Sequence, residues 1–258
     1  MIPANTLLEE SKCYLCLGIS QVEALILALY NRIIETPVAP VGPAMTISQL
    51  GQVADGTDAI TYSTTSQSPA ANSLVLAAVL NCKATTPDTP VLSGNGLTWV
   101  VVGVSTVFGS SSRLTLFRAM GAAPTPGVVT ATFGGATQIG CSIACVEFKN
   151  VKTTGTNGSG AVQQVSQNGS TSANPNTALA AFNANGRNSG FAVTGNLRNP
   201  YAGTPEAGWF TIINTGHDTP SRGLLGVYRT STTDNTVVVT AGITNWYMIA
   251  IEVNHSSS

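Results

Sequence analysis

Charged residues are scarce in this chain. Of its 258 residues only 9% are Asp, Glu, Lys or Arg, and 11 basic against 12 acidic side chains leave a formal net charge of −1. A typical soluble domain carries about 25% charged residues. Proteins that hold nucleic acid by its phosphates need a basic excess, which this sequence lacks. We therefore expect no nucleic-acid partner.

Long apolar runs are also missing. The most apolar stretch, residues 19–34, is interrupted by Glu23 and Arg32, and it is shorter than the roughly 20 residues that cross a bilayer. The N-terminal region carries Glu9 and Glu10 where a secretory signal would carry basic residues. We therefore expect no membrane partner and a protein that is made and assembled in a cytoplasm.

Histidine and cysteine, which build many catalytic and metal sites, are few. His217 is expected in a loop beside Asp218, and His255 in the frayed C-terminus, with no nucleophile motif to accompany either. Cys13 and Cys16 have the spacing of half a zinc site, but no second ligand pair follows. We expect no catalytic residue, no metal site and no cofactor.

The first 35 residues form a segment of their own. Capping-box patterns begin at Thr6 and at Ser20, with Gly18 between them, which predicts a short N-terminal α-helical hairpin. Its second helix is apolar nearly all round and must be buried, which a hairpin of this size cannot do alone. We interpret residues 1–35 as an anchoring and oligomerisation element, with packing onto the chain's own β-domain as the alternative. The expected interface is the stripe Val22, Leu25, Ile26, Leu29 and Ile33.

The remainder of the chain is typical of short strands and tight turns. Residues 36–43 contain three prolines and predict a semi-rigid linker. From residue 44 to residue 258, apolar segments of strand length alternate with turn residues, and the chain as a whole holds 26 glycines and 13 prolines. This pattern predicts a mainly β domain, an antiparallel β-sandwich.

The β-region repeats itself. Landmarks occur twice in the same order, which indicates two sequence-related halves, about residues 60–151 and 160–254. We favour one jelly-roll-like sandwich in which the halves interleave, with two small sandwiches as the alternative. The matching landmarks are Asn72-Ser73 and Asn188-Ser189, Trp99 and Trp209, Ser112-Arg113 and Ser221-Arg222, and Glu147 and Glu252.

The two repeated glutamates allow one enzymatic hypothesis. Glu147 and Glu252 are flanked by apolar residues near the ends of equivalent strands, and facing carboxylates are what a glycosidase requires. Arg118 and Arg229 also recur, so each glutamate has a candidate partner. We favour structural Glu–Arg ion pairs over a hydrolase.

Aromatic residues raise the alternative of glycan binding. Trp99 and Trp209 lie in apolar segments and are expected in the core. Tyr201, in a segment rich in Asn and Gly, is the best candidate for an exposed ring that contacts a sugar. The loop at residues 55–58 is a second candidate, and a weak one for calcium.

Several short segments resemble a known class of proteins. Residues 72–76 (Asn-Ser-Leu-Val-Leu), 96–99 (Gly-Leu-Thr-Trp), 114–118 (Leu-Thr-Leu-Phe-Arg) and 146–151 (Val-Glu-Phe-Lys-Asn-Val) resemble β-sandwich domains of tailed-bacteriophage structural proteins. The similarity spans about residues 60–254. The N-terminal segment, with Leu-Leu-Glu-Glu at 7–10 and Cys-Tyr-Leu-Cys-Leu-Gly at 13–18, resembles small anchoring segments of phage virion proteins.

This resemblance implies a virion structural protein of the decoration, fibre or tail-associated type, with no catalytic residues. We expect residues 1–35 to bind other virion proteins of capsid or tail, and the chain to form a homo-oligomer such as a trimer. The sandwich would decorate or stabilise the capsid surface. The alternative is a tail- or fibre-associated glycan-binding module for host recognition.

Overall fold

The computed structural model describes residues 22–23, 25–26, 42–171, 174–182, 186–230, 232–242 and 245–257. Contacts divide the chain into two compact units, Met1–Gly42 and Pro43–Ser258. The described residues at the head of the chain, Val22, Glu23, Leu25 and Ile26, are α-helical. The rest of the predicted hairpin, including Leu29 and Ile33, lies outside the described residues. No helix among the described residues is long and apolar enough to span a membrane.

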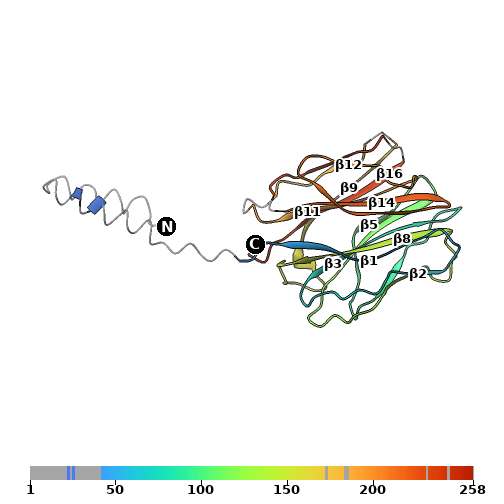
Figure 1. The fold of residues 1–258 in the computed structure, drawn as a ribbon, viewed down its shortest axis with the longest axis horizontal. Coiled ribbons are helices and arrows are strands. Elements are labelled where there is room, and N and C mark those ends of the chain that lie inside the picture. The colour runs from blue at the N-terminus through green and yellow to red at the C-terminus, as the bar shows by residue number, and fades with distance from the viewer. Residues whose placement is uncertain are drawn as a thin grey trace. The chain divides into compact units, whose positions relative to one another are not determined.

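The second unit consists of antiparallel β-sheets in a sandwich-like arrangement, which confirms the predicted mainly β class (Figure 1). Its first half forms a five-stranded sheet, β1-β8-β3-β6-β5, and a three-stranded sheet, β2-β7-β4. These strands are β1 (Thr46–Asp55), β2 (Thr61–Ser63), β3 (Leu74–Cys82), β4 (Val91–Gly94), β5 (Val100–Phe108), β6 (Ser112–Ala119), β7 (Val129–Thr132) and β8 (Gly140–Lys149).

The second half repeats this topology. Its five-stranded sheet has the order β9-β16-β11-β14-β13, and its three-stranded sheet has the order β10-β15-β12. The number of each strand is therefore that of its first-half counterpart plus eight. A short 3-10 helix, η2 (Ser159–Ala161), precedes it. The strands are β9 (Val162–Ser170), β10 (Asn176–Ala178), β11 (Ser189–Asn196), β12 (Thr204–Pro205), β13 (Phe210–Asp218), β14 (Ser221–Arg229), β15 (Thr236–Thr240) and β16 (Trp246–Val253).

The halves do not interleave, so the favoured single sandwich is wrong and the alternative of two small sandwiches is correct. Every ladder between the described strands joins strands of one half, and an isolated bridge between Val151 and His255 links the two. Each half carries a complete set of strands joined by short connections. Pairing within a half therefore closes shorter loops, which costs less chain entropy than pairing between halves.

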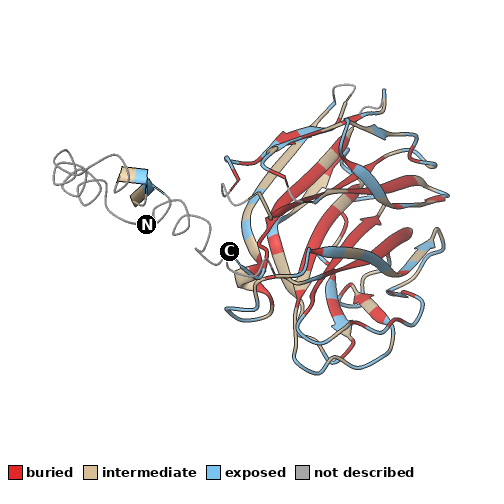
Figure 2. Cartoon of the chain, turned by 60° about the vertical axis from the view of Figure 1, so that its left-hand side comes forward, coloured by how far each residue is buried: buried red, intermediate tan, exposed pale blue. Residues whose placement is uncertain are grey.

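The two small sandwiches pack through their five-stranded sheets. On β3, Leu74 and Leu76 enter a core shared with Phe191 and Ile251 of the second half, whereas Val79 faces the three-stranded sheet of its own half. The five-stranded sheets are thus covered on both faces, and all nine residues of β3 are buried (Figure 2). The four sheets are stacked in layers: the three-stranded and five-stranded sheets of the first half, then the five-stranded and three-stranded sheets of the second half.

Candidate functional site

Tyr201, the predicted sugar-contacting residue, lies in a core and cannot stack on a ligand. Its side chain is 1% exposed, packed in the core between the two sheets of the second half, and its hydroxyl donates to Thr194 Oγ1 at 3.2 Å. Burial raises the pKa of this phenol above its usual range. The prediction for Tyr201 is wrong because a ring in an irregular segment can still fold back onto a sheet.

The loop at residues 55–58 is organised by its own side chains. Asp55 Oδ1 accepts hydrogen bonds from Thr57 Oγ1 at 2.7 Å and from the Thr57 amide at 2.8 Å, and these bonds lower the pKa of the carboxyl. Across the described ranges, no three His, Cys, Asp or Glu side chains gather where they could hold a metal ion.

The repeated glutamates are buried, and polar side chains of neighbouring strands contact both. Glu147 is 2% exposed, accepts a hydrogen bond from Ser73 Oγ at 2.7 Å and lies 3.2 Å from Lys149 Nζ. Glu252 is 1% exposed and accepts hydrogen bonds of 2.6 Å from Gln164 Nε2 and from Asn188 Nδ2. The ion-pair partner of Glu147 is thus Lys149 and not an arginine, and Arg229 pairs with Asp234 at 2.6 Å, so the predicted pairing is wrong for these two residues.

The fold also keeps the two carboxylates apart. Glu147 shares the face of β8 with Ile143 and Cys145, which contact the three-stranded sheet of the first half. Glu252 shares the face of β16 with Ala250, which lies in the corresponding core of the second half. Both five-stranded sheets separate the two groups, so they cannot act on one glycosidic bond.

Strand register explains which residues the duplication matches. Glu147 lies opposite Val75, and Glu252 lies opposite Gly190. Ser73 lies two residues before Val75, and Asn188 lies two residues before Gly190, so strand pairing makes Ser73 the equivalent of Asn188. The sequence repeat aligns Asn72 with Asn188, which differs from this pairing by one residue. Both residues donate to the repeated glutamate, so the duplicated feature is a buried carboxylate held by a polar side chain at the start of the neighbouring strand.

We expect Ser73→Ala to lower the free energy of unfolding by about 1–2 kcal/mol, because Glu147 loses a charge-assisted hydrogen bond while it stays buried. Urea denaturation measures this loss. The matched control is Ser63→Ala, where an exposed hydroxyl contacts Thr130 Oγ1, and we expect a change below about 0.5 kcal/mol. Equal effects of the two variants would contradict the role assigned to Ser73.

His217 links the two halves. It lies in β13, not in the predicted loop, and is 5% exposed. Its Nδ1 lies 3.2 Å from Ser142 Oγ and its Nε2 lies 3.4 Å from Cys82 Sγ, both on first-half strands. Burial lowers the pKa of His217 to about 4, and burial raises the pKa of Cys82 to about 11. At neutral pH the pair is an uncharged imidazole beside a protonated thiol, which is unlike the thiolate of a reactive cysteine.

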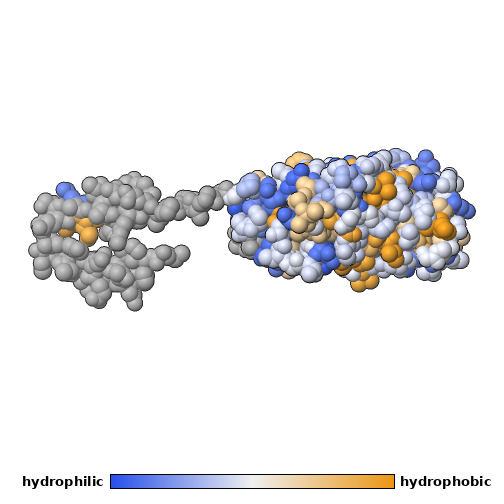
Figure 3. Space-filling view, turned by 90° about the horizontal axis from the view of Figure 1, so that it is seen from below, coloured by the Kyte–Doolittle hydropathy of each residue, from blue (hydrophilic) through white to orange (hydrophobic). Residues whose placement is uncertain are grey.

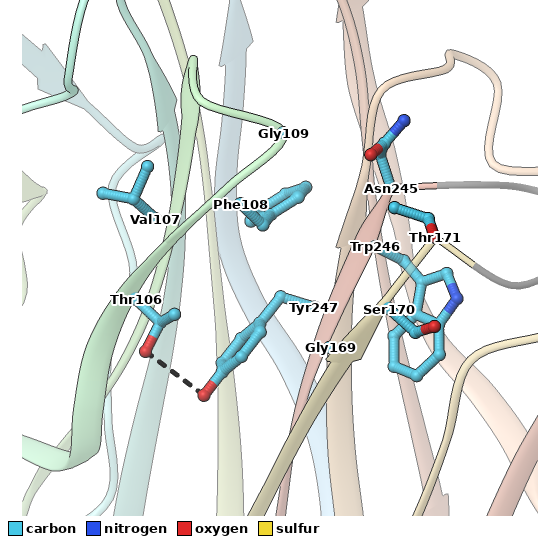
Figure 4. A pocket seen from close by; sticks show the side chains of 10 residues that line it. All are labelled: Thr106, Val107, Phe108, Gly109, Gly169, Ser170, Thr171, Asn245, Trp246 and Tyr247. Carbon is cyan, nitrogen blue, oxygen red and sulfur yellow. Dashed lines mark hydrogen bonds between the residues drawn. The ribbon is translucent and has the colours of Figure 1, made fainter.

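An open groove lies where the edges of the two halves meet. It has a volume of about 290 Å³ and is lined by residues 106–109, 169–171 and 245–247 (Figure 4). Phe108 and Tyr247 stack with ring centroids 6.5 Å apart and an interplanar angle of 18°. Thr106 Oγ1 donates a hydrogen bond of 3.2 Å to the Tyr247 hydroxyl, so β5 of one half fixes the ring from the other. Figure 4 shows Phe108 and Tyr247 on one side and Asn245 and Thr171 on the other.

Comparison of the chain with family models, curated proteins and solved structures finds no match.

The internal duplication supplies a comparison for the groove. At the related end of the domain His217 takes the place of Phe108 and packs closely on Gly140, since a Cβ added to Gly140 would lie 2.5 Å from His217 Nε2. The two ends therefore differ in the side chains that lie between the halves. The strand pairings, followed from Glu147 in one half and from Glu252 in the other, show which residues of the two ends are equivalent. The equivalent pairs are Tyr247 and Ser142, Leu197 and Cys82, and Phe108 and His217.

Proposed function

We propose that this protein is a non-enzymatic structural protein of a bacteriophage virion. Residues 1–35 form an α-helical hairpin that anchors the chain to the particle and to copies of itself, and the β-domain decorates or stabilises the capsid surface. The observation that carries the proposal is the division of the chain between Gly42 and Pro43, together with Ile26, which is 61% exposed on the apolar stripe of a helix. Among the described residues of this stripe Val22 and Leu25 are half-buried and Ile26 is exposed, which favours a partner that covers them.

The β-domain is suited to display because its own contacts fix its first residues. His255, predicted to be frayed, is 1% exposed, and its Nε2 lies 2.9 Å from the Pro43 carbonyl oxygen. Asn150 Nδ2 donates to the Ala44 carbonyl at 2.7 Å. The domain can therefore begin at Pro43 without losing an internal strand.

We also propose that each half is a jelly roll in which β5 has joined β6. The strand order β1-β8-β3-β6 opposite β2-β7-β4 supports this assignment. Virus capsid proteins commonly use this architecture. The surface is polar with few charges, and apolar side chains form small separate patches on the face in Figure 3.

We expect a chain that starts at Pro43 to fold but to be absent from purified particles. We also expect Ile26→Asp to lower incorporation about tenfold, because a charge buried in an apolar contact costs more than 1.4 kcal/mol. The matched control is Val104→Asp, at a side chain that is 63% exposed on the β-domain, and it should incorporate normally. Normal incorporation of the shortened chain would contradict the anchor.

A further inference from the structure

The groove at Phe108 and Tyr247 has the chemistry of a ligand site. None of its ten lining residues is charged, and they combine two stacked aromatic rings with hydroxyl and amide side chains. We propose that this groove binds a neutral sugar residue of a glycan. The inference goes beyond the structural role proposed above and does not depend on it.

Tyr247 supplies the accessible aromatic surface of the groove. Its side chain is half-buried, whereas Phe108 is 8% exposed and belongs to the core between the five-stranded sheets, so the apolar face of a pyranose would meet the Tyr247 ring. The face of an aromatic ring carries partial negative charge and attracts the weakly positive C–H groups of a sugar. Thr106 bonds the Tyr247 hydroxyl, and the stacking of Phe108 on Tyr247 holds both rings in place before a ligand arrives. A site whose rings are already ordered loses little entropy on binding.

The polar side chains match the hydroxyls of a sugar. Asn245 carries both a donor and an acceptor on one amide, and Thr171 is an exposed residue with a hydroxyl on the same side of the groove. Sugar hydroxyls donate and accept hydrogen bonds, so each can pair with such groups. A few polar groups beside apolar walls are what orient small molecules in their sites.

Charge and size narrow the ligand class. An anionic ligand would lose hydration in the groove without meeting a cationic side chain there, which is unfavourable. The volume of about 290 Å³ lies at the lower limit of small-molecule sites, which range from about 300 to 1,000 Å³. One neutral sugar residue, at the end of a glycan or within it, suits both limits.

The test is ligand-observed NMR on the full-length protein with glucose, galactose, mannose, rhamnose and N-acetylglucosamine, with sialic acid as the anionic probe. Asn245 has a φ of 58°, a left-handed conformation that glycine adopts freely, so Asn245→Gly removes the amide and keeps the backbone. Thr171→Ala removes the second polar group. The matched control is Phe210→Ala, an aromatic residue that is 57% exposed outside the groove.

We expect at least one neutral sugar to bind with a Kd near 1 mM or below, and sialic acid to give no signal. Asn245→Gly and Thr171→Ala should each raise the Kd about tenfold, whereas Phe210→Ala should leave it unchanged. Three results would overturn the proposal: no neutral sugar binds, only sialic acid binds, or the two groove variants bind as tightly as the unmodified chain. A failed particle-incorporation test would leave this result unaffected.

Discussion

Phe191→Ala should lower the free energy of unfolding by about 3–5 kcal/mol, the largest effect we expect from one substitution in the β-domain. Phe191 is 0% exposed and meets Phe148, also 0% exposed, edge to face with ring centroids 5.8 Å apart. The two rings come from different halves and lie in the core between the five-stranded sheets. Truncation leaves a cavity that rigid sheets on both sides cannot fill.

Because both halves share this core, they should unfold together in one transition. Tryptophan fluorescence can follow each half, since Trp99 belongs to the first half and Trp209 and Trp246 to the second. In each variant that retains the probe of one half, urea denaturation curves from tryptophan fluorescence and from circular dichroism should coincide, and Phe191→Ala should displace both curves together. The matched control, Phe210→Ala, removes an exposed ring and should change stability by less than about 0.5 kcal/mol. Two separate transitions would contradict the shared core.

Acid should destabilise the domain between pH 6.5 and about 4, and His217 should be the main cause. Its pKa falls from 6.5 to about 4 on folding, chiefly through burial and also through Arg222, with Asp55 and Asp218 opposing. Below pH 6.5 the unfolded chain therefore binds a proton that the folded chain does not. Stability is complete above pH 6.5 and is lost as pH falls toward 4. The shift corresponds to about 3 kcal/mol, which solvent screening reduces to about 2 kcal/mol.

The measurement is the free energy of unfolding from urea curves at several values across this pH range. His217→Asn removes the titrating ring and keeps a side chain that can contact Ser142, so its stability should vary much less from pH 6.5 to 4. Hydrogen bonds lower the pKa values of Asp55 and Asp88 from 3.8. The stability that these two carboxylates contribute is therefore lost only below the range from pH 6.5 to 4. An unchanged slope in His217→Asn would show that another group causes the acid sensitivity.

The sequence predicts the strands well where apolar residues are dense. The segments of β14 and β16 are rich in apolar residues, which is the pattern from which the sequence predicts a mainly β domain. Short or polar strands such as β4 and β9 carry little of this pattern, because strand pairing and not composition makes them strands. The near-continuous apolar runs of β3 and β8 already indicate burial on both faces, a signal of sheets stacked in layers.

The candidate sites were harder to predict because they join segments far apart in the chain. The groove combines residues 106–109, 169–171 and 245–247, and sequence patterns carry no information on which strand edges meet. Likewise the sequence identifies Glu147 and Glu252 as repeated residues but does not identify their partners. Ser73 and Asn188 become equivalent only through the strand register, because the sequence repeat aligns Asn188 with Asn72 instead. Such pairings follow from tertiary packing.

The mass in solution of the full-length chain, beside a chain that starts at Pro43, tests the anchor-and-display account most directly. Light scattering should show the full-length protein as an oligomer and the shortened protein as a monomer, because the N-terminal apolar stripe is the expected contact between copies. Two monomers would contradict the account, since residues 1–35 would then be buried within their own chain and not in an assembly.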